Sequence, residues 1–436
     1  MQIRMKYGKN GLNLNLPDDT GIAHIQKRTM PFMMDPVAGV YHALSHPVAS
    51  KKLIQEARGC HNACILICDI TRPVPNGVIL PVLIRELLKA GLSPSSITVI
   101  VATGLHRANE GEELRELVGD DWVLNTVKIV NHFARNNDEH VDLGVTKDGM
   151  TIKIDRRFVR ADLRIVTGLV EPHFMAGYSG GRKVVVPGIA HKDTITEFHT
   201  AKFLEHPKAM NCVLDGNPLH KEQVEIIRML GRTLAINTII DDKRRLSFVN
   251  FGEIEVSHLE AVSYLREYAE IRVPDKYKTV ITCAGGYPLD KTYYQTIKGF
   301  VGAMDILAQG GNLVIFSECS EGIGSHEFVE AQKRLLSLGM DRFLESLLAK
   351  SHAGIDEWQT EMLLKPMNIG TLHLFSKGLS DADHILTGVN VVKSPNEAVL
   401  KCIEEAEDNR VAVISEGPYV IPIFSPYAGS PQDNSI

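Results

Sequence analysis

The chain has 436 residues, of which 23% are charged, and a formal net charge of −6 at pH 7. This length predicts two or three domains with ample apolar core, and the weakly acidic balance without a long basic run argues against a nucleic-acid-binding protein. No run of about 18 apolar residues predicts a membrane span, and the first residues, MQIRMKYGKNG, lack the apolar core of a signal peptide, so we expect a cytoplasmic protein with no membrane partner.

Apolar, strand-like runs alternate with helical patterns along the chain, which predicts an α/β fold with parallel sheets. The strands predicted in the first part of the chain lie at residues 63–68, 97–102, 127–130, 163–167 and 235–240. The polar stretch 270–278 is the best linker, so we expect a first domain at 1–270 and a second at 271–436. In the second domain we expect strands at 279–283, 312–316, 371–375 and 411–414, with helices near 291–308, 327–338 and 354–364. The tail, 425–436, is expected to be loosely ordered.

Polar side chains follow the predicted strands of the first domain, at the point where each strand ends. The first strand runs into Asp69 and Arg72, the second into His106, and the strand ending at residue 167 leads to His173. In an open α/β sheet such residues lie in the binding crevice at the carboxyl edge, where Asp69 suits ribose hydroxyls and Arg72 suits a carboxylate. The alternative is that these polar residues only cap helices or form salt bridges in loops. This would explain Asp69 or Arg107, but it would not explain why two histidines occupy equivalent positions after two strands.

The segment 167–200 carries a glycine-rich turn, including Ser179 and Gly180, directly before Lys183. Glycines allow positive φ and a close approach to a ligand, and amides exposed before a helix attract anions, which favours a phosphorylated cofactor. The spacing does not match an ATP-binding P-loop, because Arg182 and Val184 replace its last glycine and its Ser or Thr. A dinucleotide fingerprint is also missing. Lys183 is predicted to bind phosphate or to act as a nucleophile, and its alternative is an ordinary surface lysine.

His199 lies in a predicted helix, ITEFHT, with Ile195 and Phe198 facing inward. Neutral imidazole is a common ligand for nickel, copper or zinc. No H-x-x-x-H, H-E-x-x-H or C-x-x-C motif accompanies His199 in this segment, so a zinc site built from protein ligands alone is not supported. The seven cysteines are predicted to be reduced core thiols rather than metal ligands.

Taken together, these motifs resemble a known family, the nickel-pincer lactate racemases and their 2-hydroxy-acid racemase and epimerase relatives. The resemblance extends over nearly the whole chain and rests on DITRPVP, GLHR, EPHFMAGYSGGRKVVVPGIA, the EFHT histidine, YQTIK at 294–298, and Trp358.

The resemblance implies a cofactor, pyridinium-3-thioamide-5-thiocarboxylic acid mononucleotide, attached covalently at Lys183, with nickel bound by His199 as its only protein ligand. It implies that His106 and His173 are acid/base residues and that Arg72, Lys298 and Tyr294 bind substrate. The residues implied to line the cofactor pocket are Asp69, Ser179, Gly180, Gln295 and Trp358. The sequence leaves open whether Tyr293 or Tyr294 faces the substrate, and spacing alone favours Lys298 as an exposed helix end and Trp358 as core.

The implied function is interconversion of D- and L-lactate by proton-coupled hydride transfer through pyruvate. Two histidines would then serve the two faces of a planar keto acid. The implied architecture is two Rossmann-like α/β domains with the cofactor in a cleft between them, and the implied partners are cofactor-making enzymes. The alternatives are a racemase or epimerase of malate, phenyllactate or a sugar acid, a conventional NAD-dependent 2-hydroxy-acid oxidoreductase, or a non-catalytic nucleotide-binding protein.

Overall fold

The structure, a computed structural model, describes residues 1–426, so nearly all of the tail expected to be loosely ordered lies outside the described residues. The chain divides into two compact units. We call them the central unit, Thr29–His199 with His206–Glu267, and the terminal unit, Met1–Arg28 with Thr200–Glu205 and the chain from Tyr268 onward. The division differs from the expected boundaries at the start of the chain. The reason is that β3 (Gly21–Ile25) pairs in parallel with β19 (Arg410–Ile414), which joins the N-terminal segment to the last sheet.

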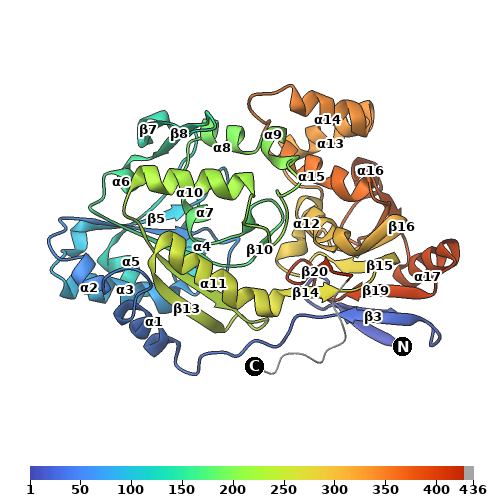
Figure 1. Cartoon of the computed structure of the whole chain (residues 1–436), viewed down its shortest axis with the longest axis horizontal. Coiled ribbons are helices and arrows are strands. Elements are labelled where there is room, and N and C mark those ends of the chain that lie inside the picture. The colour runs from blue at the N-terminus through green and yellow to red at the C-terminus, as the bar shows by residue number, and fades with distance from the viewer. Residues whose placement is uncertain (427–436) are drawn as a thin grey trace. The chain divides into compact units, whose positions relative to one another are not determined.

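The central unit is built on a six-stranded sheet (Figure 1). Its strands, in spatial order, are β13 (Leu246–Glu253), β12 (Leu234–Ile240), β9 (Leu163–Leu169), β4 (Ala63–Cys68), β5 (Ile97–Ala102) and β6 (Lys128–Asn131). All neighbours are parallel except β13, which runs antiparallel to β12. Every residue of β4 is buried, as expected for the continuous apolar run of a strand covered on both faces.

Helices and two short strand pairs complete the central unit. The helices are α1 (Pro36–Ser45), α2 (Leu53–Glu56), α3 (Asn76–Lys89), α4 (Gly111–Val118), α5 (Asp121–Thr126), α6 (Arg156–Val159), α7 (Arg182–Val185), α8 (Lys192–Phe198), α10 (Pro218–Leu230) and α11 (Ile254–Ala269). The short pairs are β7 (His140–Val145) with β8 (Thr151–Asp155), and β10 (Pro172–His173) with β11 (Gly177–Tyr178). In α3 the residues Ile79, Leu83 and Leu87 are fully buried, and their spacing of four places them on one helical face.

The terminal unit has a second six-stranded sheet, in which all neighbours are parallel. Its order is β18 (Asn390–Val392), β17 (Thr371–Phe375), β16 (Leu307–Phe316), β15 (Tyr277–Cys283), β19 and β3. The predicted linker at 270–278 lies beside the break between the two units, but it is not an irregular segment, because it contains β14 (Glu270–Val273) and the start of β15. β14 pairs with β20 (Ile421–Phe424), a partner that local composition could not reveal.

The helices of the terminal unit are α9 (Ala201–Leu204), α12 (Tyr293–Ala303), α13 (His326–Leu338), α14 (Met340–Leu348), α15 (Glu357–Met367), α16 (Asp381–Leu386) and α17 (Pro395–Ala406). The predicted helix at 291–308 is too long at its end. A 3₁₀ turn at Met304–Ile306 follows α12, and the chain enters β16 at Leu307.

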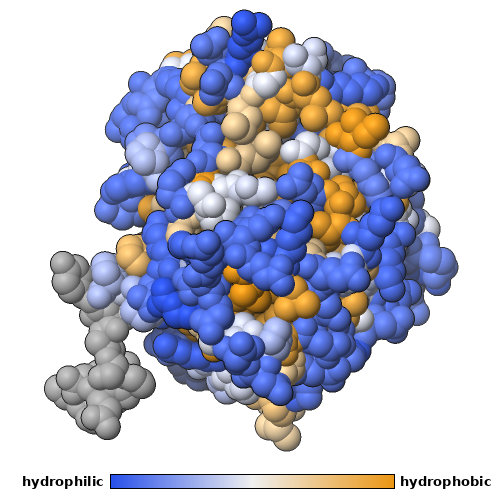
Figure 2. All heavy atoms as spheres, turned by 90° about the vertical axis from the view of Figure 1, so that its right-hand side faces the viewer, coloured by the Kyte–Doolittle hydropathy of each residue, from blue (hydrophilic) through white to orange (hydrophobic). Residues whose placement is uncertain are grey.

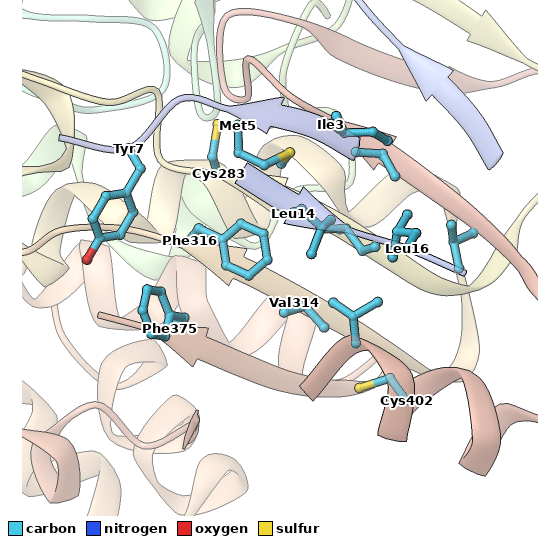
Figure 3. Packing of buried hydrophobic residues seen from close by; sticks show 14 residues of the cluster. Ile3, Met5, Tyr7, Leu14, Leu16, Cys283, Val314, Phe316, Phe375 and Cys402 are labelled. Atoms are coloured by element: carbon cyan, nitrogen blue, oxygen red, sulfur yellow. The ribbon is translucent and has the colours of Figure 1, made fainter. Parts of the chain in front are cut away.

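An N-terminal hairpin, β1 (Gln2–Met5) and β2 (Leu12–Asn15), supplies part of the core of the terminal unit. Figure 3 shows Met5 and Leu14 close to Cys283 and Phe316, which come from β15 and β16. Burial of each such side chain stabilises the fold by roughly 1.5–3 kcal/mol. The hairpin is therefore an integral part of this unit.

The face of the molecule drawn in Figure 2 is largely hydrophilic, with apolar residues in separate patches. The exposed apolar residues of the terminal unit include Leu336, Leu348 and Ile385. Within residues 1–426, no helix combines the length and the apolar character needed to cross a membrane.

Candidate active site

The ends of three neighbouring parallel strands, β4, β5 and β9, carry the predicted site residues of the central unit. Since the strands are parallel, their carboxyl ends lie at one edge of the sheet. Two contacts join the loops that follow them. His106 Nδ1 lies 2.6 Å from Asp69 Oδ2, and Arg72 NH1 lies 2.9 Å from Glu171 Oε2. The structure thus brings Asp69, Arg72 and His106 together with the segment that leads into His173.

Asp69 is a buried carboxylate held by its neighbours. Its Oδ1 accepts a hydrogen bond from Thr71 Oγ1 at 2.6 Å, while its Oδ2 faces His106. Burial opposes ionisation of this carboxyl group, but the hydrogen bonds from His106 and Thr71 and the charge of Arg72 outweigh burial and lower its pKa. The side chain of His106 is 56% exposed, so its other ring nitrogen remains accessible.

Glu171 is a site residue that the sequence analysis missed. Its contact with Arg72 involves only one edge of the guanidinium, which has five N–H donors. Glu171 lies two residues after the end of β9 and precedes Pro172-His173, and this position near a strand end was the signal that could have identified it.

His173 lies in the short hairpin β10–β11. Its Nδ1 accepts hydrogen bonds from the backbone N–H groups of Met175 and Ala176, at 3.3 and 3.2 Å. The turn needs glycine at position 177, where φ is +76° and a Cβ atom would lie 2.2 Å from Val213 O. The glycine therefore allows a tight turn immediately after His173.

The glycine-rich turn packs against the chain's own atoms. Gly180 has a φ of +78°, and a Cβ atom there would lie 2.8 Å from Val170 Cγ2. The hydroxyl of Ser179 is fully buried, donates to Leu169 O at 2.7 Å and accepts from Glu171 N at 3.0 Å. These contacts tie the turn to the end of β9. A role of Ser179 or Gly180 in cofactor binding stays a prediction.

Arg182 is a second residue whose role the sequence analysis missed. It is 2% exposed, and its NH2 donates to the carbonyls of Ala176 and Tyr178 at 3.1 and 3.2 Å. Its Nε donates to His220 Nδ1 at 2.7 Å. Burial lowers the pKa of Arg182 to about 9, and burial together with the Arg182 charge lowers the pKa of His220 to about 3. Neutral His220 can therefore accept the hydrogen bond from the guanidinium N–H, and the proton stays on Arg182.

Lys183 and His199 lie near each other in the central unit. Helix α7, which carries Lys183, packs on β4 and β9. His199 ends α8, where its Nδ1 donates to Ile195 O at 2.8 Å, and Ile195 and Phe198 are buried as predicted. The pKa of His199 is lowered to about 4, chiefly by burial; the hydrogen bond to Ile195 opposes this shift, and the positive charge of Lys183 adds to it.

The His199 arrangement fits a single metal ligand. A neutral ring that donates from Nδ1 to a carbonyl keeps a lone pair on Nε2, which is the usual arrangement of metal-binding histidines. Within residues 1–426, no group of three or more His, Cys, Asp or Glu side chains is arranged to hold a metal ion. A metal at His199 would therefore need most of its remaining ligands from a bound molecule or from water.

The other predicted site residues lie in the terminal unit, on α12 and α15. Tyr293 is fully buried and donates its hydroxyl hydrogen to Thr387 O at 2.7 Å. Tyr294 is only partly buried, and its hydroxyl accepts from Trp358 Nε1 at 3.2 Å. The structure therefore makes Tyr293 a core residue and Tyr294 the partly accessible one. Trp358 is 7% exposed, as its helical spacing favoured.

Gln295 and Lys298 lie three positions apart on α12, which places them on one flank of the helix. The Oε1 atom of Gln295 is buried and has no hydrogen-bond partner among the described residues. A buried acceptor without a partner costs about 1–3 kcal/mol. This atom fits a position that receives a donor from a bound molecule.

Comparisons with known proteins bear on the whole chain. The model for the lactate racemase N-terminal domain matches residues 7–211, and the model for the lactate racemase C-terminal domain matches residues 274–422. A lactate racemase from Thermoanaerobacterium thermosaccharolyticum is 32% identical over 375 residues, covering 83% of this chain and 85% of that protein. A lactate racemase from Lactiplantibacillus plantarum is 30% identical over 429 residues, covering 96% of this chain and 99% of that protein.

A solved structure shows the same architecture. The lactate racemase apoprotein from Thermoanaerobacterium thermosaccharolyticum matches with a TM-score of 0.89 and 28% identity, over 97% of this chain and 100% of that chain. This match confirms the predicted α/β fold in two domains. Together with the two family models, it shows that the chain belongs to the lactate racemase family of isomerases, as its motifs predicted.

Proposed function

We propose that this chain is a lactate racemase that interconverts D- and L-lactate through pyruvate, with a nickel nucleotide attached at Lys183 and bound by His199. The observation that carries the proposal is the meeting of Arg72 and His106 with the segment leading into His173 at one edge of the central sheet. This edge combines a carboxylate-binding cation with two imidazoles. The relatives named as lactate racemases support lactate as the substrate.

The chemistry explains why such residues are needed. The α-hydrogen of a 2-hydroxy acid is very weakly acidic, so its removal as hydride avoids a carbanion beside a carboxylate. When bound, the nickel nucleotide would supply the hydride acceptor. The protein's own task is to take the hydroxyl proton, for which a positioned imidazole typically contributes roughly 10²–10⁴-fold in rate. It must also hold the planar keto acid until hydrogen returns.

Arg72 is the proposed carboxylate-binding residue of the central unit. Its NH1 is engaged by Glu171, which fixes the orientation of the guanidinium and leaves its other donors for a bidentate contact. We further propose Lys298 and Tyr294 as substrate-binding residues, and Gln295, Trp358, Asp69, Ser179 and Gly180 as cofactor-binding residues. These assignments rest on the resemblance of their motifs and, for Gln295, on its buried acceptor.

The experiment begins with loading, because enzymes that make the cofactor are the proposed partners of this protein. Full-length protein should be produced with and without such enzymes. Intact mass and nickel analysis should then show a cofactor-sized adduct and one equivalent of nickel only after co-production. Peptide mapping should place the adduct on Lys183, and an adduct on another lysine would contradict the assignment.

The loaded protein should convert either lactate enantiomer to the racemic mixture, as followed by chiral chromatography, whereas the unloaded protein should not. Malate, phenyllactate and a sugar acid form the comparison panel. Racemisation of one of these in place of lactate would move the proposal to another 2-hydroxy acid. Net formation of keto acid with NADH would instead favour the oxidoreductase alternative.

A further inference from the structure

The histidines proposed as acid/base residues have contrasting hydrogen-bond partners. Asp69 Oδ2 lies 2.6 Å from Nδ1 of His106, and a second bond from Thr71 Oγ1 fixes the other carboxylate oxygen. An ionised carboxylate can only accept hydrogen bonds, so the proton lies on Nδ1 of His106. In the neutral ring this leaves a lone pair on Nε2.

His173 has the opposite arrangement. The N–H groups of Met175 and Ala176 both point at its Nδ1, at 3.3 and 3.2 Å. A backbone N–H can only donate, so Nδ1 of His173 carries the lone pair. The neutral ring must then carry its proton on Nε2.

Buried side chains hold the two amide donors in place. Asn217 Nδ2 donates to Met175 O at 2.9 Å, and Arg182 NH2 donates to Ala176 O at 3.1 Å. Asn217 is fully buried, and Arg182 is 2% exposed. Reversing the tautomer of His173 would place two N–H groups against a protonated Nδ1, so the surrounding structure must break several bonds before this ring can change.

We propose that Asp69 and the amides of Met175 and Ala176 hold the two histidines in opposite tautomers, so that His106 presents a lone pair on Nε2 and His173 presents an N–H on Nε2. Asp69, Asn217 and Arg182 are then positioning residues. The inference deepens the proposed function and rests on it for its catalytic meaning. The two histidines are not interchangeable. His106 can then accept a proton on Nε2, with Asp69 stabilising the resulting imidazolium, whereas His173 offers an N–H at the same ring position, so the two rings enter the reaction in different protonation patterns.

NMR on the full-length protein tests the tautomers without any assay of activity. The histidines are labelled with ¹⁵N and ¹³C in an otherwise deuterated chain, and their signals are assigned by loss in His106→Gln and His173→Gln. We expect the Nδ1–H pattern for His106 and the Nε2–H pattern for His173 in the unloaded protein. Finding the same tautomer for both rings would overturn the inference.

Asp69→Asn provides the second measurement. The amide that replaces the carboxylate can donate to Nδ1, so His106 should change to the Nε2–H pattern. Glu113→Gln is the matched control, because Glu113 binds Arg107 at the surface of the same region without contacting either histidine. It should leave both patterns unchanged. Unchanged His106 signals in a folded Asp69→Asn variant would remove Asp69 from the positioning role.

In the loaded enzyme, Asp69→Asn should lower kcat by roughly 10²–10⁴-fold with nickel content and KM retained, which is the range expected when a general base is impaired. Loss of nickel with normal His106 signals would instead make Asp69 a cofactor-binding residue only. If the loaded wild-type protein racemises no 2-hydroxy acid, the proposed function fails, and the NMR patterns still decide the tautomers.

Discussion

At the scale of single residues, hydrogen bonds to the ring nitrogens distinguish three histidines that the sequence could not tell apart. His199 donates from Nδ1 to Ile195 O, at the end of its own helix. His106 faces a carboxylate, and His173 accepts from two amides. Only the first arrangement combines a buried neutral ring, a lone pair on Nε2 and the neighbouring charge of Lys183. The environments therefore suit different roles, metal ligand for His199 and proton or hydrogen-bond exchange for the others.

The roles of His199 and His173 can be separated by substitution. In protein loaded with the nickel nucleotide, His199→Ala should lose nickel, because the only proposed protein ligand is removed. His173→Ala should keep nickel and lose racemisation by roughly 10²–10⁴-fold, since removal of a proton-transfer group leaves ground-state binding nearly unchanged. Metal analysis after gel filtration, beside a chiral lactate assay, measures both effects. Nickel retained by His199→Ala but lost from His173→Ala would mean that His173 is the metal ligand and His199 the proton-transfer residue.

At the scale of secondary structure, α15 carries two buried glutamates in opposite environments. Glu357 contacts Arg334 and Lys350 at 2.7 and 2.6 Å. Burial opposes its ionisation, but the hydrogen bonds from Lys350, Gly354 and Arg334 outweigh burial and lower its pKa. Glu361, one turn later, is 1% exposed. The pKa of Glu361 is raised to about 9, chiefly by burial. Repulsion from Glu205 and a hydrogen bond to Glu205 add to this effect. The same residue type is therefore ionised at one position and protonated at the other.

This difference predicts opposite effects of two matched substitutions. Glu361 stays protonated in the folded state up to about pH 9 but ionises in the unfolded chain near its ordinary value of about 4.3. The free energy of unfolding should therefore fall as pH rises between these values. Glu361→Gln removes this pH-dependent loss of stability. The substitution should therefore raise the free energy of unfolding at pH 8, and by more than it does at pH 5.

Glu357→Gln on the same helix serves as the comparison. It should destabilise the protein at pH 8, because it leaves Arg334 and Lys350 without their buried carboxylate. Urea unfolding followed by circular dichroism at pH 5 and pH 8 measures both variants. Equal destabilisation by the two substitutions at pH 8 would show that Glu361 is ionised in the folded protein.

At the scale of the whole molecule, several buried neutral histidines link folding to acid. Burial, with neighbouring positive charges, lowers the pKa of both His132 and His220 to about 3. It also lowers that of His258 well below its ordinary value. In the unfolded chain each of these rings takes up a proton near its ordinary pKa of about 6.5. In the folded protein the same ring stays neutral down to a lower pH. Protons therefore bind preferentially to the unfolded state as the pH falls.

The stability of the protein should decrease from about pH 6.5 downward, toward the folded-state pKa values of about 3. For a ring as buried as His132, the loss approaches about 1.4 kcal/mol per pH unit. Urea unfolding at pH 7.5, 6.5, 5.5 and 4.5 measures the slope. His132→Gln should make the slope shallower, whereas His352→Gln at an exposed position should not. A slope that is the same for wild type and His132→Gln would mean that His132 is already charged in the folded protein.

The sequence by itself determined most strands of the two six-stranded sheets and the order of the motifs. Residues 63–68, 97–102 and 371–375 form strands with the predicted bounds, because continuous apolar runs between polar segments are a local property of the chain. Parallel pairing then places the residues after β4, β5 and β9 at one edge, so the strand pattern was sufficient to predict Asp69, Arg72 and His106 beside the segment that leads into His173.

Only the tertiary structure decided which atoms meet there. Arg72 pairs with Glu171, Ala176 is held by Arg182, and Met175 is held by Asn217, and none of these partners is marked by a local pattern. The same holds for larger features. β3 completes a sheet with β19, and β14 pairs with β20 inside a stretch whose polar composition predicted a linker. Local periodicity reports the burial of each residue, whereas these contacts join segments that are distant in sequence, and the packing of the whole chain selects them.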